Sequence, residues 1–283
     1  MCNEYESSAP TLYAMYCKGS GGSTKPVGST STFTDSFKLN AASLPTEDSP
    51  YGIEAISTFL TSGAPPGIPN LAIIKGFHRF GTGISTASSN TFYSNDLYGR
   101  LTGPSKLTTL TPHEVSRGYF TNLNLGTSFS LLDLGLGLRV QVGFSARYNK
   151  ITNTIGGGPA VLLASPYFTL GLGVSREKTS NYLLRSDFVS FMASTRIYIL
   201  ELEFNLLSNN SVPMLNSISI FSGNIAFSNL IFTGAVRQLN YLSEGNVTQF
   251  HAGVQYLLSR HVSLGYLYNY IPGGNSLGLQ IFL

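Results

Sequence analysis

The chain is poor in charge and has no long apolar runs. Asp, Glu, Lys and Arg make up 11% of its 283 residues, whereas an ordinary soluble domain has about 25%. The hydrophobic fraction, 42%, is not raised to compensate. A disordered chain would carry few aromatics, but this one has 16 Tyr and 18 Phe. A helical membrane protein needs apolar runs of about 18 residues, and stretches such as Ala160 to Ala164 are far shorter. These absences leave an all-β protein whose surface does not need charge.

Cysteine is also scarce. Cys2 and Cys17 both lie near the N-terminus, and no CxxC or Cys/His spacing indicates a zinc site. The pair predicts either a local disulfide, which needs an oxidising compartment, or a lipidated Cys2. The net charge of +3 comes from scattered basic residues, so we expect no nucleic-acid partner. We also expect no metal site and no cofactor.

Residues 1–46 differ in texture from the rest of the chain. They include Gly19 to Thr24 and Ser29 to Thr32, which are small, polar and without periodicity. Met1 is followed by neither a basic nor an apolar leader region. The protein therefore either stays inside the cell or is a mature chain with an added start methionine, and the composition favours the mature chain.

Strict alternation of apolar and polar residues dominates the remaining sequence. From Leu134 to Asn149, every even position is apolar or aromatic and every odd position is Gly, Ser, Gln, Asn or Arg. This period of two predicts a strand with two unlike faces, longer than the usual 5–6 residues or so. The pattern recurs in further segments: 119–129, 168–175, 198–205, 250–259, 262–270 and 277–283. We predict 12 to 14 antiparallel strands, with 51–101 and 212–227 the uncertain parts of the count.

Period two fits both a soluble β-sandwich and a membrane barrel, so other features must decide. The long strands favour a barrel. Glycine recurs on the polar face, where a crowded lumen favours small residues, at Gly135, Gly137, Gly143, Gly171, Gly173, Gly253 and Gly265. Aromatics that suit an interfacial girdle end several apolar runs, at Tyr148, Phe168, Tyr198, Phe250 and Tyr270. We predict a transmembrane antiparallel β-barrel of about 14 strands in the bacterial outer membrane, in contact with membrane lipids.

Two stretches carry resemblances to known proteins. Leu277 to Leu283 resembles the C-terminal targeting strand of bacterial outer-membrane proteins, except that Phe282 is penultimate. Asn40-Ala41-Ala42, followed by Ser49 to Glu54 and Gly76 to Gly83, resembles the start of barrels of the long-chain fatty-acid transporter family. In that family an Asn-Pro-Ala motif ends an N-terminal segment folded inside the barrel; here Ala41 replaces the proline.

The resemblance implies a lumen occluded by the N-terminal segment and passage of an apolar solute. Independently, about 14 strands enclose a space too wide for their own small side chains to fill. We therefore predict a plug over residues 1–46 and a barrel over 47–283. The expected function is a channel or transporter for small hydrophobic molecules. The alternative is a structural barrel that anchors a partner protein at the cell surface or in a secretion complex.

Few residues of the polar face are charged. The candidate ligand or lumen residues are the charged Arg139, Arg147, Glu201 and Glu203 and the polar Gln141 and His251. They form either a charged ladder that binds a carboxylate head group or sets ion selectivity, or structural ion pairs that brace the barrel wall or hold the plug. We expect His251 to fill a hydrogen-bonding role. If the protein were a membrane enzyme, replacement of His251 would abolish hydrolysis. No G-x-S-x-G motif accompanies it, so we expect a protein that is not an enzyme.

Overall fold

The computed structural model describes fourteen strands and one short helix. It covers residues 40–44, 46, 51–60, 70–88, 120–134, 138–149, 154–165, 167–179, 185–209, 215–241, 245–259, 261–269 and 274–283. The elements are η1 (Ala41–Ser43), β1 (Gly52–Leu60), β2 (Asn70–Phe77), β3 (Phe80–Ser88), β4 (Phe120–Asp133), β5 (Arg139–Asn149), β6 (Thr154–Ala164), β7 (Phe168–Thr179), β8 (Arg185–Ile197), β9 (Leu200–Asn209), β10 (Leu215–Phe227), β11 (Leu230–Tyr241), β12 (Gly245–Leu257), β13 (Val262–Asn269) and β14 (Gly274–Phe282). Within this part of the chain, no helix is long and apolar enough to cross a membrane.

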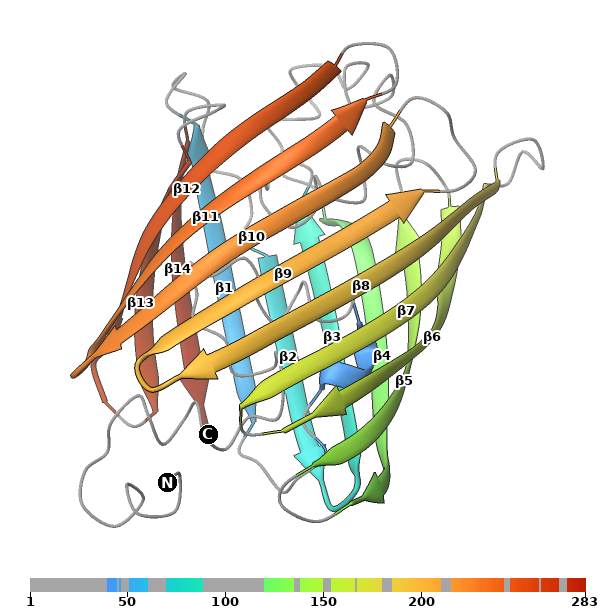
Figure 1. The fold of residues 1–283 in the computed structure, drawn as a ribbon, viewed down its shortest axis with the longest axis horizontal. Helices are drawn as coiled ribbons and strands as arrows, with labels where there is room; N and C mark the ends of the chain where they lie inside the picture. The colour runs from blue at the N-terminus through green and yellow to red at the C-terminus, as the bar shows by residue number, and fades with distance from the viewer. Residues whose placement is uncertain are drawn as a thin grey trace.

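The strands form one closed antiparallel barrel (Figure 1). Each strand pairs with its sequence neighbours, and β1 pairs with β14 over nine residues, from Gly52↔Phe282 to Leu60↔Gly274. Closure leaves no strand edge with unpaired backbone groups, which a bilayer would not tolerate. The predicted fold class, an antiparallel barrel of about 14 strands, is confirmed.

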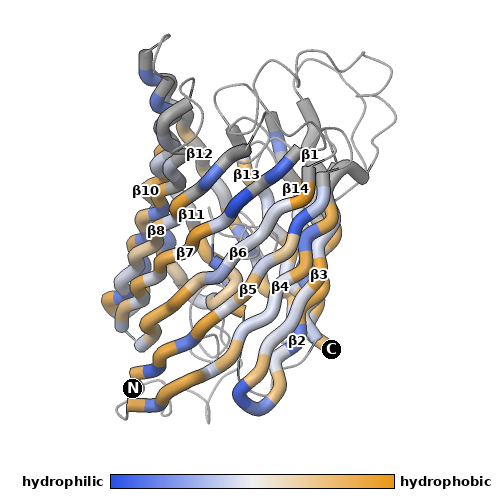
Figure 2. The backbone as a smooth tube through the Cα atoms, turned by 90° about the vertical axis from the view of Figure 1, so that its right-hand side faces the viewer, coloured by the Kyte–Doolittle hydropathy of each residue, from blue (hydrophilic) through white to orange (hydrophobic). Residues whose placement is uncertain are grey.

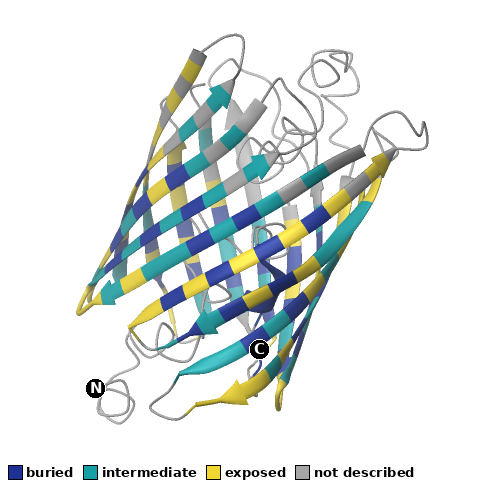
Figure 3. Ribbon diagram, turned by 45° about the vertical axis from the view of Figure 1, so that its right-hand side comes forward, coloured by how far each residue is buried: buried dark blue, intermediate teal, exposed yellow. Residues whose placement is uncertain are grey.

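Burial alternates along each strand, as the bands in Figure 3 show. On β7, Leu170, Leu172 and Val174 point outward and are exposed, while Gly171 and Gly173 point inward and are buried. Polar residues such as Asn124 and Ser128 are also buried on the inner face. Figure 2 shows the same alternation as hydropathy along the backbone. Since the apolar face points away from the interior, the inside-out polarity is that of a membrane-spanning barrel.

Exposed aromatic rings gather at one end of the barrel, where short turns join consecutive strands. Those at this end are Tyr51, Phe77, Phe129, Tyr167, Phe168, Tyr198 and Phe227. Near the opposite strand ends, Tyr148 and Tyr268 are exposed on the outer face, whereas the exposed Phe250 lies near the middle of β12. Two bands of aromatic rings that border an apolar belt mark the two membrane interfaces of a β-barrel. The predicted girdle is thus present at Tyr148, Phe168 and Tyr198, while Phe250 lies near the middle of β12 and Tyr270 lies outside the described residues.

Turns of two residues connect β2 to β3, β8 to β9 and β10 to β11. Each includes a non-glycine residue in the left-handed region: Arg79 (φ 62), Tyr198 (φ 53) and Ser228 (φ 54). Such a residue lets a two-residue loop follow the twist of the strands. The C-terminus is at this same end, where Tyr51 and Leu283 exchange backbone hydrogen bonds of 2.8 and 2.9 Å. We call this the short-turn end of the barrel.

Two details differ from the sequence pattern. The alternation from Leu134 to Asn149 predicted one strand, but β5 begins at Arg139 and the Leu134 N–H donates to the Leu138 carbonyl at 2.8 Å. A turn therefore falls inside the alternating run, because a polar–apolar rhythm does not fix where a chain reverses. Leu257, which interrupts the rhythm on β12, points inward and packs against Ile231.

A polar network braces the junction between the first and last strands. Gln280 Nε2 donates to Glu54 Oε2 at 2.9 Å, and Gln255 Nε2 donates to Gln280 Oε1 at 3.0 Å and to Ser263 Oγ at 2.7 Å. All four side chains are buried on the inner face. The network therefore spans four consecutive strands, β1, β14, β13 and β12, across the closure.

Replacing Gln280 with leucine is expected to lower the free energy of unfolding by about 1–3 kcal/mol, since buried hydrogen-bonding groups lose a partner. Guanidinium titration in lipid vesicles measures this change. The matched control is Gln238→Leu on β11, a partly exposed glutamine with no side-chain hydrogen bond in the described part of the chain. An equal loss in both variants would contradict a special role for the closure network.

Candidate functional site in the barrel lumen

A short segment of chain lies against the inner wall of the barrel. Asn40 to Leu44 and Thr46 are all at most 3% exposed, and η1 contacts β4, β5 and β6. We call residues 40–44 and 46 the inner segment. Figure 3 shows this segment as buried and within the ring of strands.

Local hydrogen bonds explain why the inner segment forms a 3₁₀ turn. The Asn40 side chain caps it, because its Oδ1 accepts the Ala42 N–H at 2.9 Å. The Ser43 hydroxyl donates to the Asn40 carbonyl at 2.8 Å, and the Leu44 N–H donates to the Ala41 carbonyl at 3.2 Å. The turn thus satisfies many of its own polar groups and presents two small alanines to the wall.

Glycines on the wall make room for these alanines. A Cβ on Gly143 of β5 would overlap the backbone of Ala41 and Ala42, and a Cβ on Gly171 of β7 would crowd the Asn40 side chain. Ala42 joins an apolar cluster on the inner face, formed with Ala160, Leu162, Ala164 and Met192. The inner segment therefore has a built docking site with a fitted shape.

Hydrogen bonds from three strands and one turn hold the inner segment at this site. The bonds are Asn40 Nδ2 to the Val161 carbonyl (3.1 Å), Ser128 Oγ to the Leu44 carbonyl (3.1 Å), Gln141 Nε2 to Thr46 Oγ1 (2.7 Å) and the Arg79 N–H to the Thr46 carbonyl (2.9 Å). Because the partners are on β6, β4, β5 and the β2–β3 turn, the contact depends on the assembled barrel.

The predicted residues on β5 point inward. Gln141 is fully buried and holds Thr46, while Arg147 is 8% exposed and its Nη2 donates to Ser175 Oγ at 3.3 Å. Arg139 is partly buried near the short-turn end, opposite Asp133 in the β4–β5 register. One residue of this predicted row thus contacts the inner segment, and binding of a carboxylate by the two arginines remains a prediction.

Glu201 and Glu203 also point inward, from β9, but β6, β7 and β8 separate this strand from β5. Glu201 forms an ion pair of 3.8 Å with Arg196 of β8, and Glu203 Oε1 accepts the Asn205 Nδ2 hydrogen at 2.6 Å. The described contacts of these carboxylates are therefore with neighbours on the same wall. Their role in binding or selectivity remains a prediction.

The remaining predicted site residues are less completely described. His251 lies on β12, opposite Ala235 and Asn269 in register, but its side chain is outside the described residues. Cys2, Cys17 and most of the plug predicted over residues 1–46, namely residues 1–39 and 45, also lie outside them. In the described part of the chain, no group of three or more His, Cys, Asp or Glu is placed to hold a metal ion.

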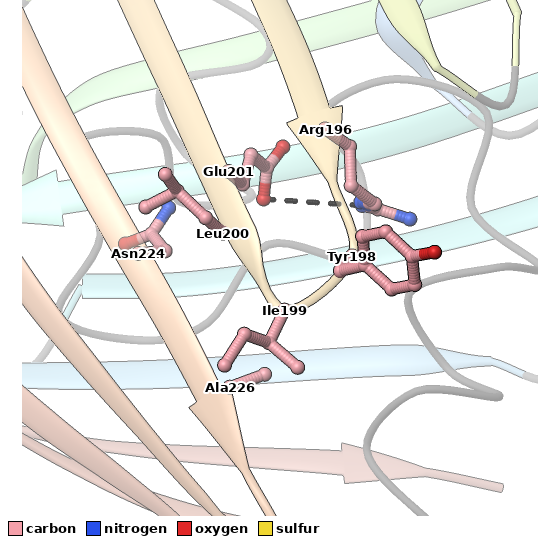
Figure 4. A pocket seen from close by; sticks show the side chains of 7 residues that line it. All are labelled: Arg196, Tyr198, Ile199, Leu200, Glu201, Asn224 and Ala226. Carbon is pink, nitrogen blue, oxygen red and sulfur yellow. Dashed lines mark ion pairs between the residues drawn. The ribbon is translucent and has the colours of Figure 1, made fainter.

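A pocket at the short-turn end involves two residues that the sequence did not single out. Arg196 and Asn224 line it together with Glu201, and Ile199, Leu200 and Ala226 supply its apolar surface (Figure 4). The exposed ring of Tyr198 lies beside the turn at its edge. Arg196 could have been found as an inward position on β8 by the same alternation that identified Glu201.

Comparisons with known proteins supply structural similarity without a sequence family. No protein-family model and no curated protein matches the chain. Among solved structures, the chain is similar to variants of the porin of Rhodopseudomonas blastica. One, carrying five substitutions, has 11% identity and a TM-score of 0.49; another, a triple mutant, has 11% identity and a TM-score of 0.48. Both matches cover 83% of this chain and 99% of the porin.

The resemblance to the fatty-acid transporter family gains no support from a family model or a curated relative. TM-scores below 0.5 are also too low to carry a functional argument. The chain is a closed, membrane-type β-barrel with an occupied inner docking site.

Proposed function

We propose that this protein is an outer-membrane channel whose inner segment regulates passage through the lumen. The observation that carries the proposal is the docking of residues 40–44 and 46 on a glycine-bearing inner wall by hydrogen bonds from several strands. A braced barrel needs no such fitted peptide merely to close its sheet. A segment held by a few neutral hydrogen bonds, each worth about 1 kcal/mol, can leave without unfolding the barrel.

We further propose that the solutes are small and at least partly apolar. The inner wall carries apolar side chains among its polar ones, which favours this class. The buried examples are Ile74, Leu162, Met192, Ile220, Ile231, Leu257 and Leu267. A purely polar lining would favour hydrated ions and sugars, whereas a mixed lining also offers contact to short hydrocarbon chains.

Solute efflux from liposomes tests both parts of the proposal. We expect removal of residues 1–46 to raise efflux, and we expect a short-chain fatty acid to leave faster than a sugar of similar size once spontaneous leakage through protein-free liposomes is subtracted. Equal rates for the two solutes would contradict the apolar preference but leave the channel intact.

Absence of efflux for every solute, even without residues 1–46, would contradict the channel. That result would favour the alternative, a closed barrel that anchors or scaffolds a partner protein. The extensive burial of the inner-wall polar residues, with Gln141 and Ser222 fully buried, is the observation that favours this second function. Co-purification of a stoichiometric partner from the native membrane would support it.

A further inference from the structure

Two cations follow the apolar row on the outer face of β7. Leu172, Val174, Arg176 and Lys178 alternate along this face, and all four side chains are exposed. β7 ends at Thr179, at the end of the barrel opposite the short-turn end, which we call the loop end. The outer surface of this strand therefore changes from apolar to cationic as it approaches the loop end.

Tyr148 places the two cations near the membrane interface. Tyr148 of β5 is opposite Ile155 of β6, and Ile155 is opposite Lys178 of β7. Exposed aromatic rings at the ends of barrel strands lie at the level of the lipid head groups, and Tyr148 is such a ring. Lys178 is two strand spacings, about 10 Å, from this tyrosine, so a lipid head group can reach it.

Acidic residues offset only part of the positive charge on this surface. Arg176 Nε donates to Asp187 Oδ1 of β8 at 2.7 Å, and Lys178 is opposite Arg185 in the same register. Like charges at opposite positions destabilise a sheet, and an anion bound beside them removes this cost. Glu177 occupies the alternate position of β7, and its side chain is outside the described residues. Within the described part of the chain, Lys178 has no ion-pair or hydrogen-bond partner.

The surface beside the cations suits a hydrocarbon chain. Val174 and Leu172 continue the outer row from Arg176 toward the middle of β7, and both are exposed. Gly157 is opposite Arg176 on β6 and has no side chain to cover the guanidinium. A head group bound to the two cations can therefore keep its acyl chains against Val174 and Leu172.

We propose that Arg176 and Lys178 bind the phosphate of an anionic membrane lipid in the leaflet at the loop end. Arg176 donates its Nε–H to Asp187, so the N–H groups of its two Nη atoms are available for phosphate oxygens. Lys178 supplies a second charge. A free phosphate would gain these contacts but not the apolar ones, which favours a lipid. The site is on the outer face and does not depend on whether the lumen conducts.

The chain has no tryptophan, so one introduced tryptophan reports on the lipid next to it. Val174→Trp places this reporter beside Arg176 in the full-length protein. Vesicles of dioleoylphosphatidylcholine and dioleoylphosphatidic acid are prepared with brominated acyl chains on one lipid or the other, and the quenching is compared. We expect phosphatidic acid to bind about tenfold more tightly than phosphatidylcholine at this position, since each cation contributes about fivefold and Asp187 offsets part of it.

Phe250→Trp is the matched reporter on another part of the outer face. Phe250 is exposed and is five positions from Gly245, where β12 begins, just as Val174 is five positions from Thr179, where β7 ends. Both reporters therefore lie at a similar distance from the loop end. The relative binding constant of the two lipids should be about one at Phe250→Trp, because no pair of cations follows it on β12.

Lys178→Gln in the Val174→Trp background tests the charge itself. We expect it to lower the preference for phosphatidic acid about fivefold. The matched control is Lys75→Gln, which removes an outward cation of β2 at the short-turn end, beside the Tyr51 ring, and should leave the preference unchanged. Equal preference at the two reporters, no effect of Lys178→Gln, or an equal effect of Lys75→Gln would overturn the proposal.

Discussion

Replacing Gly143 with valine is expected to release the inner segment from the wall of the barrel. A Cβ at this position would overlap the backbone of Ala41 and Ala42, while β5 itself should tolerate valine, a good strand former. Overpacking of this kind costs about 1–3 kcal/mol. The ratio of undocked to docked barrels should therefore rise about tenfold.

Labelling of a cysteine in the inner segment measures this release. Ser43 is 1% exposed, so Ser43→Cys, combined with Cys2→Ser and Cys17→Ser, should react slowly with a soluble thiol reagent. In the Gly143→Val background we expect the rate to rise about tenfold. The matched control is Gly234→Val on β11, where a Cβ would meet no atom within 4 Å. Equal labelling rates of the Ser43→Cys protein with and without Gly143→Val would contradict the docking of the inner segment at Gly143.

Replacing Leu172 with arginine is expected to lower the free energy of unfolding in lipid vesicles by about 2–4 kcal/mol. Leu172 is on β7, is 58% exposed and lies in the middle of the outer apolar row between Phe168 and Val174. A cation at this depth has no water to hydrate it. The expected loss of about 2–4 kcal/mol is the cost measured for arginine near the midplane of membrane barrels.

The cost of an outward-facing arginine falls from the middle of the membrane to its interface, so a variant near the interface is the control. Thr195 of β8 points outward opposite Phe168 at the short-turn end, so Thr195→Arg should cost at most about 1 kcal/mol. Guanidinium titration of both variants and the wild type, in the same vesicles, gives the comparison. A Leu172→Arg protein as stable as the wild type would mean that the outer face of β7 is not in contact with lipid.

The outward or inward direction of many residues could be predicted from the sequence, because a strand has a period of two. Asn124, Gln141 and Glu203 point inward as the alternation requires. The alternation fails where both faces are apolar. On β2, Leu71 and Ile73 are exposed while Ala72 and Ile74 are buried, so a continuous apolar run hides the two faces.

Strands that are apolar on both faces also made part of the candidate site unpredictable from the sequence. On β10, Ile220 is buried inside and the adjacent Phe221 is exposed outside, which obscured the strand that carries Asn224. Contacts between distant parts of the chain were also beyond a local pattern. Gln141 meets Thr46 across 95 positions of sequence, and Gln280 meets Glu54 across 226. These contacts depend on barrel closure and on where the inner segment enters the barrel. Neither feature changes the alternation of polar and apolar residues along a strand.

Current across a planar lipid bilayer tests the central claim most directly, because it requires insertion, a continuous lumen and control by the inner segment. With equal amounts of inserted protein, we predict discrete current steps whose open fraction is about tenfold higher for Gly143→Val than for the wild type, and unchanged for Gly234→Val. Current steps of equal open fraction in all three proteins, or no current from any of them, would contradict the claim.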